Sequence, residues 1–163
     1  MALSPASVKR WMYRNNRPNR LARFLNRLTA AYFGGGVLSS PRWTILEVRG
    51  RRTGRVIAAP VVLADHEGGH YLVSMLGEDV NWVRNVRAAG GRAVLRRRGR
   101  RAVRLVEVPV GERAPILRRY LELAPGARPH FPVTRRAPLG EFARIAGRYP
   151  VFRVLPGDAT GDG

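Results

Sequence analysis

The residues best suited to bind a ligand stand in a short turn, Gly50-Arg51-Arg52-Thr53-Gly54-Arg55, between two apolar runs. Guanidinium groups and turn amides chelate phosphate or carboxylate, and the Thr53 hydroxyl adds a donor. A surface hairpin needs only glycine and a small polar residue. Three arginines in a glycine-bounded turn therefore favour a fixed anionic ligand. A solvated hairpin in an arginine-rich protein is the alternative, and the spacing alone leaves both open.

A second candidate stretch, residues 73–85 (VSMLGEDVNWVRN), runs from the end of a strand into a helix. Such turns expose amides at the positive helix terminus, where anions bind. Trp82 in the first helical turn could stack on a flat ring, and Asn85 follows one turn later. In the competing interpretation Asp79 caps the helix, Trp82 packs in the core and Asn85 faces solvent. Taken alone, the stretch favours that second interpretation.

A third stretch, residues 92–108 (RAVLRRRGRRAVRLVEV), places seven arginines in one hairpin. Such a stripe could bind nucleic acid. However, it lacks the interleaved aromatic side chains on which single-strand binders stack bases. Charge on an exposed strand face or edge, which blocks edge pairing, is the favoured explanation, and no specific nucleic-acid partner is expected.

No catalytic dyad stands out among the acid–base candidates, which are Asp65, Glu78, Asp79, His130 and Glu141. Ser74 has no GxSxG context, and neither GxGxxG nor a Walker A sequence occurs. Ligand-binding features without a dyad are typical of redox enzymes, in which the cofactor carries the chemistry.

The composition fits one domain, residues 1–163, with 30 Lys and Arg against 11 Asp and Glu and a net charge of +19. Lys9 is the only lysine, so the bias reflects codon usage as much as function. A field this positive attracts polyanions and phosphorylated ligands. The absence of cysteine excludes disulfides, cysteine nucleophiles and cysteine metal sites, and no metal is expected.

The helices and strands that must position these residues can be predicted from the periodicity of apolar residues and from the glycine and proline residues that end each element. The predicted order is helices at 5–14 and 19–33, strands at 43–50, 55–65 and 70–75, a helix at 80–89, a hairpin of 92–97 with 101–110, a helix at 111–124, a proline-broken loop, a short helix at 138–146 and a last strand at 149–156. This order predicts an α+β, mainly β chain: a helical segment at 1–36, a small, partly open barrel of about six strands at 42–156, and a tail at 157–163.

The predicted helix at 19–33 is basic and amphipathic. That pattern fits a peripheral contact with a membrane surface and fits a helix covering a barrel end equally well. The N-terminus lacks an apolar leader, and no run approaches a membrane span. A cytoplasmic protein, with or without membrane association, is expected.

Taken together and in order, several motifs resemble the deazaflavin (F420)-dependent nitroreductase and quinone reductase family. They are GRRTGRVIAAPV, YLVSM, NWVRNVRAAG, the basic hairpin and the closing segment APGARPHFPVTRRAPLGEFARIAGRYPVFRV. The resemblance runs from about Trp43 to Phe152. It implies a split β-barrel related to FMN-binding barrels, and reduced coenzyme F420 as a hydride donor.

The resemblance also implies the cofactor site. The arginine turn would hold the phosphate and acidic tail, the following strand would line the deazaflavin, the strand-end serine would touch the ring edge or phosphate, and the helix would complete the groove. The implied residues are Arg51, Arg52, Thr53, Gly54, Ile57, Ala58, Ala59, Pro60, Val61, Val62, Val73, Ser74, Met75, Asn81, Trp82, Val83, Arg84 and Asn85.

The expected activity is hydride transfer from reduced deazaflavin to a small electron acceptor, which is quinone-like, nitro or otherwise conjugated. Tyr120 and Phe131 are expected to line the acceptor pocket, and the candidate proton donors are Tyr32, Tyr120 and His130. Three alternatives stay open: an FMN-binding barrel, a non-catalytic flavin or deazaflavin binder, and a basic nucleic-acid or membrane-surface protein. Related barrels often dimerise, so a homodimer is also open.

Overall fold

The computed structural model describes residues 42–157. The predicted helices at 5–14 and 19–33, with Tyr32, lie outside the described residues. The described elements follow the predicted order closely, with most bounds within two residues. They are β1 (Trp43–Arg49), β2 (Val56–His66), β3 (Gly69–Val73), α3 (Asn81–Ala88), β4 (Arg92–Arg96), β5 (Arg100–Glu107), α4 (Ala114–Leu123), α5 (Leu139–Ile145) and β6 (Val151–Pro156), with short 3-10 turns η2 (Val110–Glu112), η3 (Pro125–His130) and η4 (Ala146–Arg148).

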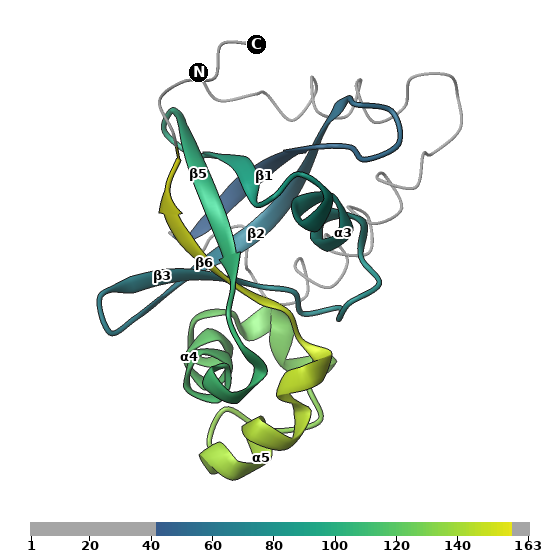
Figure 1. The fold of residues 1–163 in the computed structure, drawn as a ribbon. Coiled ribbons are helices and arrows are strands. Elements are labelled where there is room, and N and C mark those ends of the chain that lie inside the picture. Colours follow the sequence, from purple (N-terminus) through teal and green to yellow (C-terminus); the bar gives the residue numbers. More distant parts are fainter. Residues whose placement is uncertain (1–41, 158–163) are drawn as a thin grey trace.

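The strands form a closed antiparallel barrel in the order β1-β2-β3-β6-β5-β4 (Figure 1). The sequence predicts a partly open barrel, but β1 also pairs with β4, with Leu46 opposite Leu95. This pairing closes the barrel. Both strands of the basic hairpin are therefore paired on both sides, so their arginines do not protect a sheet edge, because closure removes the edges.

The barrel interior follows from alternation along the strands, since successive side chains point to opposite faces. In β1, Leu46 and Val48 are buried inside, and their partners include Val61, Leu95 and Val103. Helix α3 adds the side chains Trp82, Val83 and Val86 to the same cluster. This helix therefore packs as part of the barrel core, which fixes its position relative to the strands.

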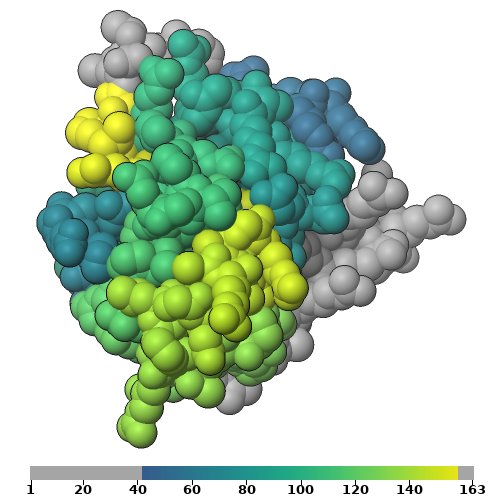
Figure 2. Space-filling model, turned by 60° about the horizontal axis from the view of Figure 1, so that its bottom comes forward, coloured from purple at the N-terminus to yellow at the C-terminus, as the bar shows by residue number. Residues whose placement is uncertain are grey.

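A second core lies on the outer side of β2 and β3, where α4 packs against the sheet and α5 packs on α4. Val62 and Ala64 belong to this outer core, whereas Val61 belongs to the barrel interior. Leu117, Leu121 and Phe142 are fully buried against the outer face. Figure 1 shows α4 and α5 below the barrel, and Figure 2 shows β5, α4 and α5 as one continuous surface. Strand β2 thus has one face in each core.

The ends of α3 are set by the backbone. Gly91 has φ +84, and a Cβ built there would stand 2.3 Å from the carbonyl oxygen of Leu105; the Leu105 N–H also donates to the Gly91 carbonyl at 2.7 Å. At the start, the predicted Asp79 cap is wrong: Val80 is the N-cap and no side chain caps the helix. Asp79 instead pairs with Arg84 at 2.7 Å, which leaves the first helical amides unoccupied by a side chain.

Helices among the described residues are all too short or too polar to span a membrane. Within residues 42–157, no three His, Asp or Glu side chains come together in a way that could hold a metal ion.

Candidate functional site

The arginine turn between β1 and β2 is a compact, hydrogen-bonded loop. The Gly50 N–H donates to the Arg55 carbonyl at 2.7 Å and the Gly54 N–H to the Gly50 carbonyl at 2.9 Å. Gly54 has φ +71, a conformation that favours glycine. The Thr53 hydroxyl oxygen accepts from the Arg55 N–H at 3.3 Å. All the side chains from Arg51 to Arg55 are exposed, so the turn presents its donors outward from a fixed backbone.

Asn85 on α3 holds this turn. Its Oδ1 accepts from the backbone N–H of Arg51 at 3.1 Å and from the Arg51 Nη1 at 2.9 Å. The side chain is 1% exposed, so the interpretation in which Asn85 faces solvent is wrong. Its Nδ2 is buried and has no partner among residues 42–157. A buried amide donor without a partner is costly, and it lies beside the turn where an anion would bind.

Trp82 connects the turn to a groove. It lies three residues before Asn85, so both side chains occupy one side of α3. Trp82 is 5% exposed and its ring packs against Phe152, with centroids 5.7 Å apart. It also lines a narrow groove, whose cavity volume is about 10 Å³. The ring is therefore both part of the core and one wall of a cleft.

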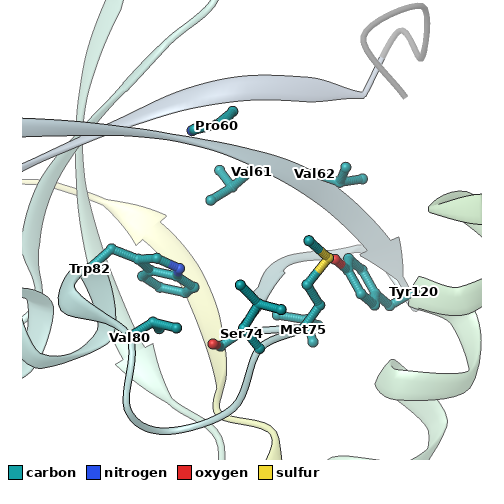
Figure 3. A pocket seen from close by; sticks show the side chains of 10 residues that line it. Pro60, Val61, Val62, Ser74, Met75, Val80, Trp82 and Tyr120 are labelled. Carbon is teal, nitrogen blue, oxygen red and sulfur yellow. The ribbon is translucent and has the colours of Figure 1, made fainter. Parts of the chain in front are cut away.

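The groove runs between β2, the loop after β3, α3 and α4 (Figure 3). The strand side is apolar, and Tyr120 closes the opposite end, where Figure 3 shows the Met75 side chain beside it. The lining residues are Pro60, Val61, Val62, Val73, Ser74, Met75, Leu76, Val80, Trp82 and Tyr120. An apolar lining with a few polar groups is typical of sites for flat rings, but such sites usually have volumes of about 300 Å³ or more, and this groove is much narrower.

Ser74 shapes the groove through the backbone. Its hydroxyl donates to the Gly77 carbonyl at 2.6 Å, and its N–H donates to the Pro150 carbonyl at 2.9 Å. The side chain is 1% exposed. The resemblance implies that Ser74 touches a ring edge or phosphate, but its proton is engaged within the loop. Ser74 therefore fixes the bend that carries Met75 and Leu76 to the groove.

Three predicted parts of the site come together here: the arginine turn, the strand-end stretch and the helix that follows it. Other predicted cofactor residues lie elsewhere. Ala59 and Val83 are buried in the barrel interior, Asn81 is exposed, and Arg84 pairs with Asp79. Two residues that line the groove, Leu76 and Val80, were not among the predicted site residues. Both lie within the candidate stretch 73–85, so including every residue of that stretch would have found them.

Only one of the two residues predicted to line the acceptor pocket lies at the groove. Tyr120 lines the groove, whereas Phe131 does not. The Phe131 ring stacks on Tyr149 with centroids 4.0 Å apart and lies 6.2 Å from Tyr120. The carbonyl of His130 accepts from the Tyr149 hydroxyl at 2.8 Å, and burial raises the pKa of Tyr149. Phe131 and Tyr149 thus support Tyr120 as neighbours in the outer core.

An ionic network that sequence reasoning missed ties the loop before α3 to α4. Arg87 donates to Glu107 at 2.8 Å and to Glu78 at 3.3 Å. Arg113, 3% exposed, donates to Glu107 at 3.1 Å and to three backbone carbonyls. Hydrogen bonds from Arg87, then the charge of Arg113, hold the pKa of Glu107 below its usual value. This network joins the two elements on either side of the groove.

The comparison with protein families gives one match. The family model described as F420H(2)-dependent quinone reductase matches residues 20–130. This range includes the arginine turn, the groove and Tyr120. A comparison with curated proteins gives no significant match.

Among solved structures, one with a TM-score above 0.5 shares the fold, and two others are reported beside it. A protein of unknown function from Agrobacterium tumefaciens superposes with a TM-score of 0.54 at 12% identity, over 75% of this chain and 51% of that chain; the chain thus spans about half the length of that relative. A FAD-binding protein from Mesorhizobium loti gives 0.45 at 17% identity, over 76% and 86%. A structure named as an F420-H2 dependent reductase gives 0.42 at 22% identity, over 70% and 94%.

Proposed function

The chain belongs to the F420H(2)-dependent quinone reductase family, and we propose that it binds reduced F420 along the groove from the arginine turn to Tyr120. The proposal includes a small conjugated acceptor, quinone-like or nitro, that takes up the hydride. One observation carries it: Asn85 bonds Arg51 at the turn, while Trp82 on the same side of α3 lines the apolar groove. The anionic and flat parts of one ligand would meet these two features.

The residues present fit the chemistry of such a cofactor, and the groove must widen to admit its ring. F420 is a flat deazaflavin with a phosphodiester and an oligoglutamate tail, which makes it a polyanion. Arg51 and Arg52, with turn amides, would hold the phosphodiester through charge-assisted hydrogen bonds. The buried Nδ2 of Asn85, which has no partner among the described residues, would donate to the same ligand. Trp82 and Val61 would cover the ring and exclude water from it.

When bound, reduced F420 supplies a hydride; the protein supplies position and surroundings. Pro60, Val61 and Val62 of β2 line the groove and would contact the ring. Tyr120, at the far end of the groove and 1% exposed, is the proposed proton donor through its hydroxyl. Met75 beside it would set how closely the acceptor approaches. Orienting two reactants in a water-poor cleft accounts for most of the rate that a protein adds to such a transfer.

The test is a fluorescence titration of the purified protein with F420 and, separately, FMN at moderate salt. Arg51→Ala/Arg52→Ala should weaken F420 binding about a hundredfold, the equivalent of two charge-assisted hydrogen bonds. The matched control is Arg92→Gln/Arg104→Gln, which removes two exposed arginines paired across β4 and β5 and should leave binding unchanged. Tighter binding of FMN than of F420 would favour the alternative of an FMN-binding barrel. Binding of neither by folded protein would refute it.

The remaining predictions about partners do not depend on this groove. The membrane contact was assigned to residues 19–33, which lie outside the described residues. That contact and a homodimer stay predictions.

A further inference from the structure

A cavity of about 510 Å³ lies at the barrel end where β1 begins, away from the arginine turn at the end of β1. It is lined by Arg42, Thr44, Leu63, Leu95 and residues 97–101. The two ends of β1 are about 20 Å apart, given the rise of an extended strand. In Figure 1 the β1–β2 turn projects at the upper right and the β4–β5 hairpin rises at the upper left. This cavity, called here the barrel-mouth site, is thus separate from the groove.

Strand alternation makes the site apolar below and cationic above. In β4, Ala93 and Leu95 are buried inside the barrel; the strand ends at Arg96, and Arg97 is the first residue of the hairpin bend. In β5, Val103 is buried inside, and the preceding position of that orientation is Arg101. Leu95 pairs directly with Arg101 across the two strands. An apolar floor of leucines therefore passes into guanidinium groups within a single strand step.

The charges at this mouth are only partly balanced. Arg42 pairs with Asp65, and Glu47 pairs with both Arg96 and Arg100 at 3.0 Å. Arg96 and Arg100 stand directly opposite each other, and their shared carboxylate partner offsets the repulsion between these like charges.

Three arginines remain. The guanidinium groups of Arg97, Arg98 and Arg101 have no hydrogen-bond or carboxylate partner among residues 42–157. They gather on one five-residue segment at the rim of the cavity. Like charges placed this close repel one another. A bound counter-charge would remove that repulsion, and guanidinium groups bind carboxylate and phosphate in bidentate fashion.

We propose that the barrel-mouth site binds a small amphipathic anion. A carboxylate or phosphate head would lie between Arg97, Arg98 and Arg101, and an apolar body would extend over Leu63 and Leu95. The volume suits such a ligand, since small-molecule sites typically enclose about 300–1,000 Å³. The mouth of a β-barrel is a recurrent place for ligands of this kind. The barrel-mouth site shares no residue with the groove, so this proposal can be tested independently of the F420 proposal.

The test uses the full chain and isothermal titration calorimetry at about 0.15 M salt, where exposed charges are screened beyond about 8 Å. The probes are decanoate and decyl phosphate, both monomeric; decanol and inorganic phosphate are the single-feature controls. Binding of one or both anionic probes, with neither control binding comparably, is expected, and the tighter anionic probe distinguishes a carboxylate from a phosphate ligand. Inorganic phosphate binding as well as decyl phosphate would overturn the proposal, because it would reveal only ion exchange. No binding of either anionic probe to folded protein would also overturn it.

Variants locate the site. Arg97→Gln/Arg101→Gln should weaken binding of the better probe at least about tenfold, which corresponds to one charge-assisted hydrogen bond lost. Arg92→Gln/Arg104→Gln, on the same hairpin, and Arg51→Ala/Arg52→Ala, at the groove, should change it less than about twofold. Equal loss in the hairpin control would refute a built site. Loss only in the Arg51/Arg52 variant would place the probe in the groove and equally refute the proposal.

Discussion

Asn85 Oδ1 accepts two hydrogen bonds from one residue, the backbone N–H and the Nη1 of Arg51, 34 positions earlier in the chain. The contact joins the barrel's β1–β2 turn to the helix that carries Trp82. Because one oxygen fixes both the backbone and the guanidinium, the direction in which Arg51 points is set by α3. The turn and the groove are therefore one structural unit.

Replacing Asn85 by alanine tests that unit. Asn85→Ala removes both hydrogen bonds, and we expect the free energy of unfolding to fall by about 1–2 kcal/mol and the Kd for F420 to rise about tenfold. Asn85→Asp keeps an acceptor for Arg51 but places a negative charge beside the proposed phosphodiester, so it should bind F420 more weakly than Asn85→Ala despite comparable or greater stability. Urea unfolding and fluorescence titration measure the two effects. Equal F420 affinity in wild type and Asn85→Ala would remove Asn85 from the site.

Ser74 is expected to matter for stability more than for binding. Ser74→Ala deletes the hydrogen bond to the Gly77 carbonyl, and its loss should lower the free energy of unfolding by about 1 kcal/mol. The Kd for F420 should change less than about threefold, because the hydroxyl proton is already used within the loop. Ser74→Thr is the matched control, since it retains the hydroxyl. A large loss of affinity at unchanged Tm would instead show direct contact with the ligand.

Much of this architecture could be predicted from the sequence because local signals agreed with the fold. Alternation marked β1 and β2, and Gly90-Gly91 marked the end of α3, where a positive φ and a close approach to Leu105 require glycine. Barrel closure could not be predicted, since it depends on pairing between β1 and β4, which are distant in the chain. Strand alternation alone does not specify the partner of an outer strand.

The sequence motifs that form the site could be predicted, but the contacts between them could not. The arginine turn and the W-x-x-N spacing stood out as motifs, but which side of α3 meets the turn depends on tertiary packing. For the same reason Asn85 was expected to face solvent in one interpretation, whereas it is buried and holds the turn. Nothing in the sequence marked Arg113 and Glu107 as an ion pair. Arginine is common in this chain, and the neighbouring residues do not indicate which arginine is buried.

Glu107 should make stability depend on pH in the acid range. Its folded-state pKa is lowered, first by hydrogen bonds from Arg87. Its contribution to stability is therefore present above the unfolded pKa of about 4.3 and is lost as pH falls through the lower folded pKa. Glu107→Gln should lower the free energy of unfolding by about 1 kcal/mol at pH 7, since the pair with Arg87 is partly exposed and screened by solvent, and by less at pH 3. Urea unfolding at both pH values measures this. An equal loss at pH 7 and pH 3 would contradict the assigned ionic role.

Tyr120 is the proposed proton donor, and its hydroxyl can be removed with little change in shape. Tyr120→Phe should leave the Kd for F420 within about threefold and lower kcat about a hundredfold or more, within the range for a general acid. Phe131→Leu, a neighbour in the outer core that does not line the groove, is the control for disturbed packing. Single-turnover oxidation of bound F420H2 by a quinone measures the step. A Tyr120→Phe enzyme with normal kcat would assign Tyr120 to packing alone.

Gly91 should be indispensable for the placement of α3. It has φ +84, and a Cβ there would meet the Leu105 carbonyl oxygen at 2.3 Å, whereas Gly90, at φ +64, has open space around it. Gly90→Ala should therefore cost about 1 kcal/mol, the strain of a left-handed residue. Gly91→Ala should cost about 3 kcal/mol or more, because the helix must also move away from β5. Since α3 carries Trp82 and Asn85, Gly91→Ala should lose F420 binding even where it folds, while Gly90→Ala keeps it. Equal stability of the two variants by urea unfolding would contradict this account.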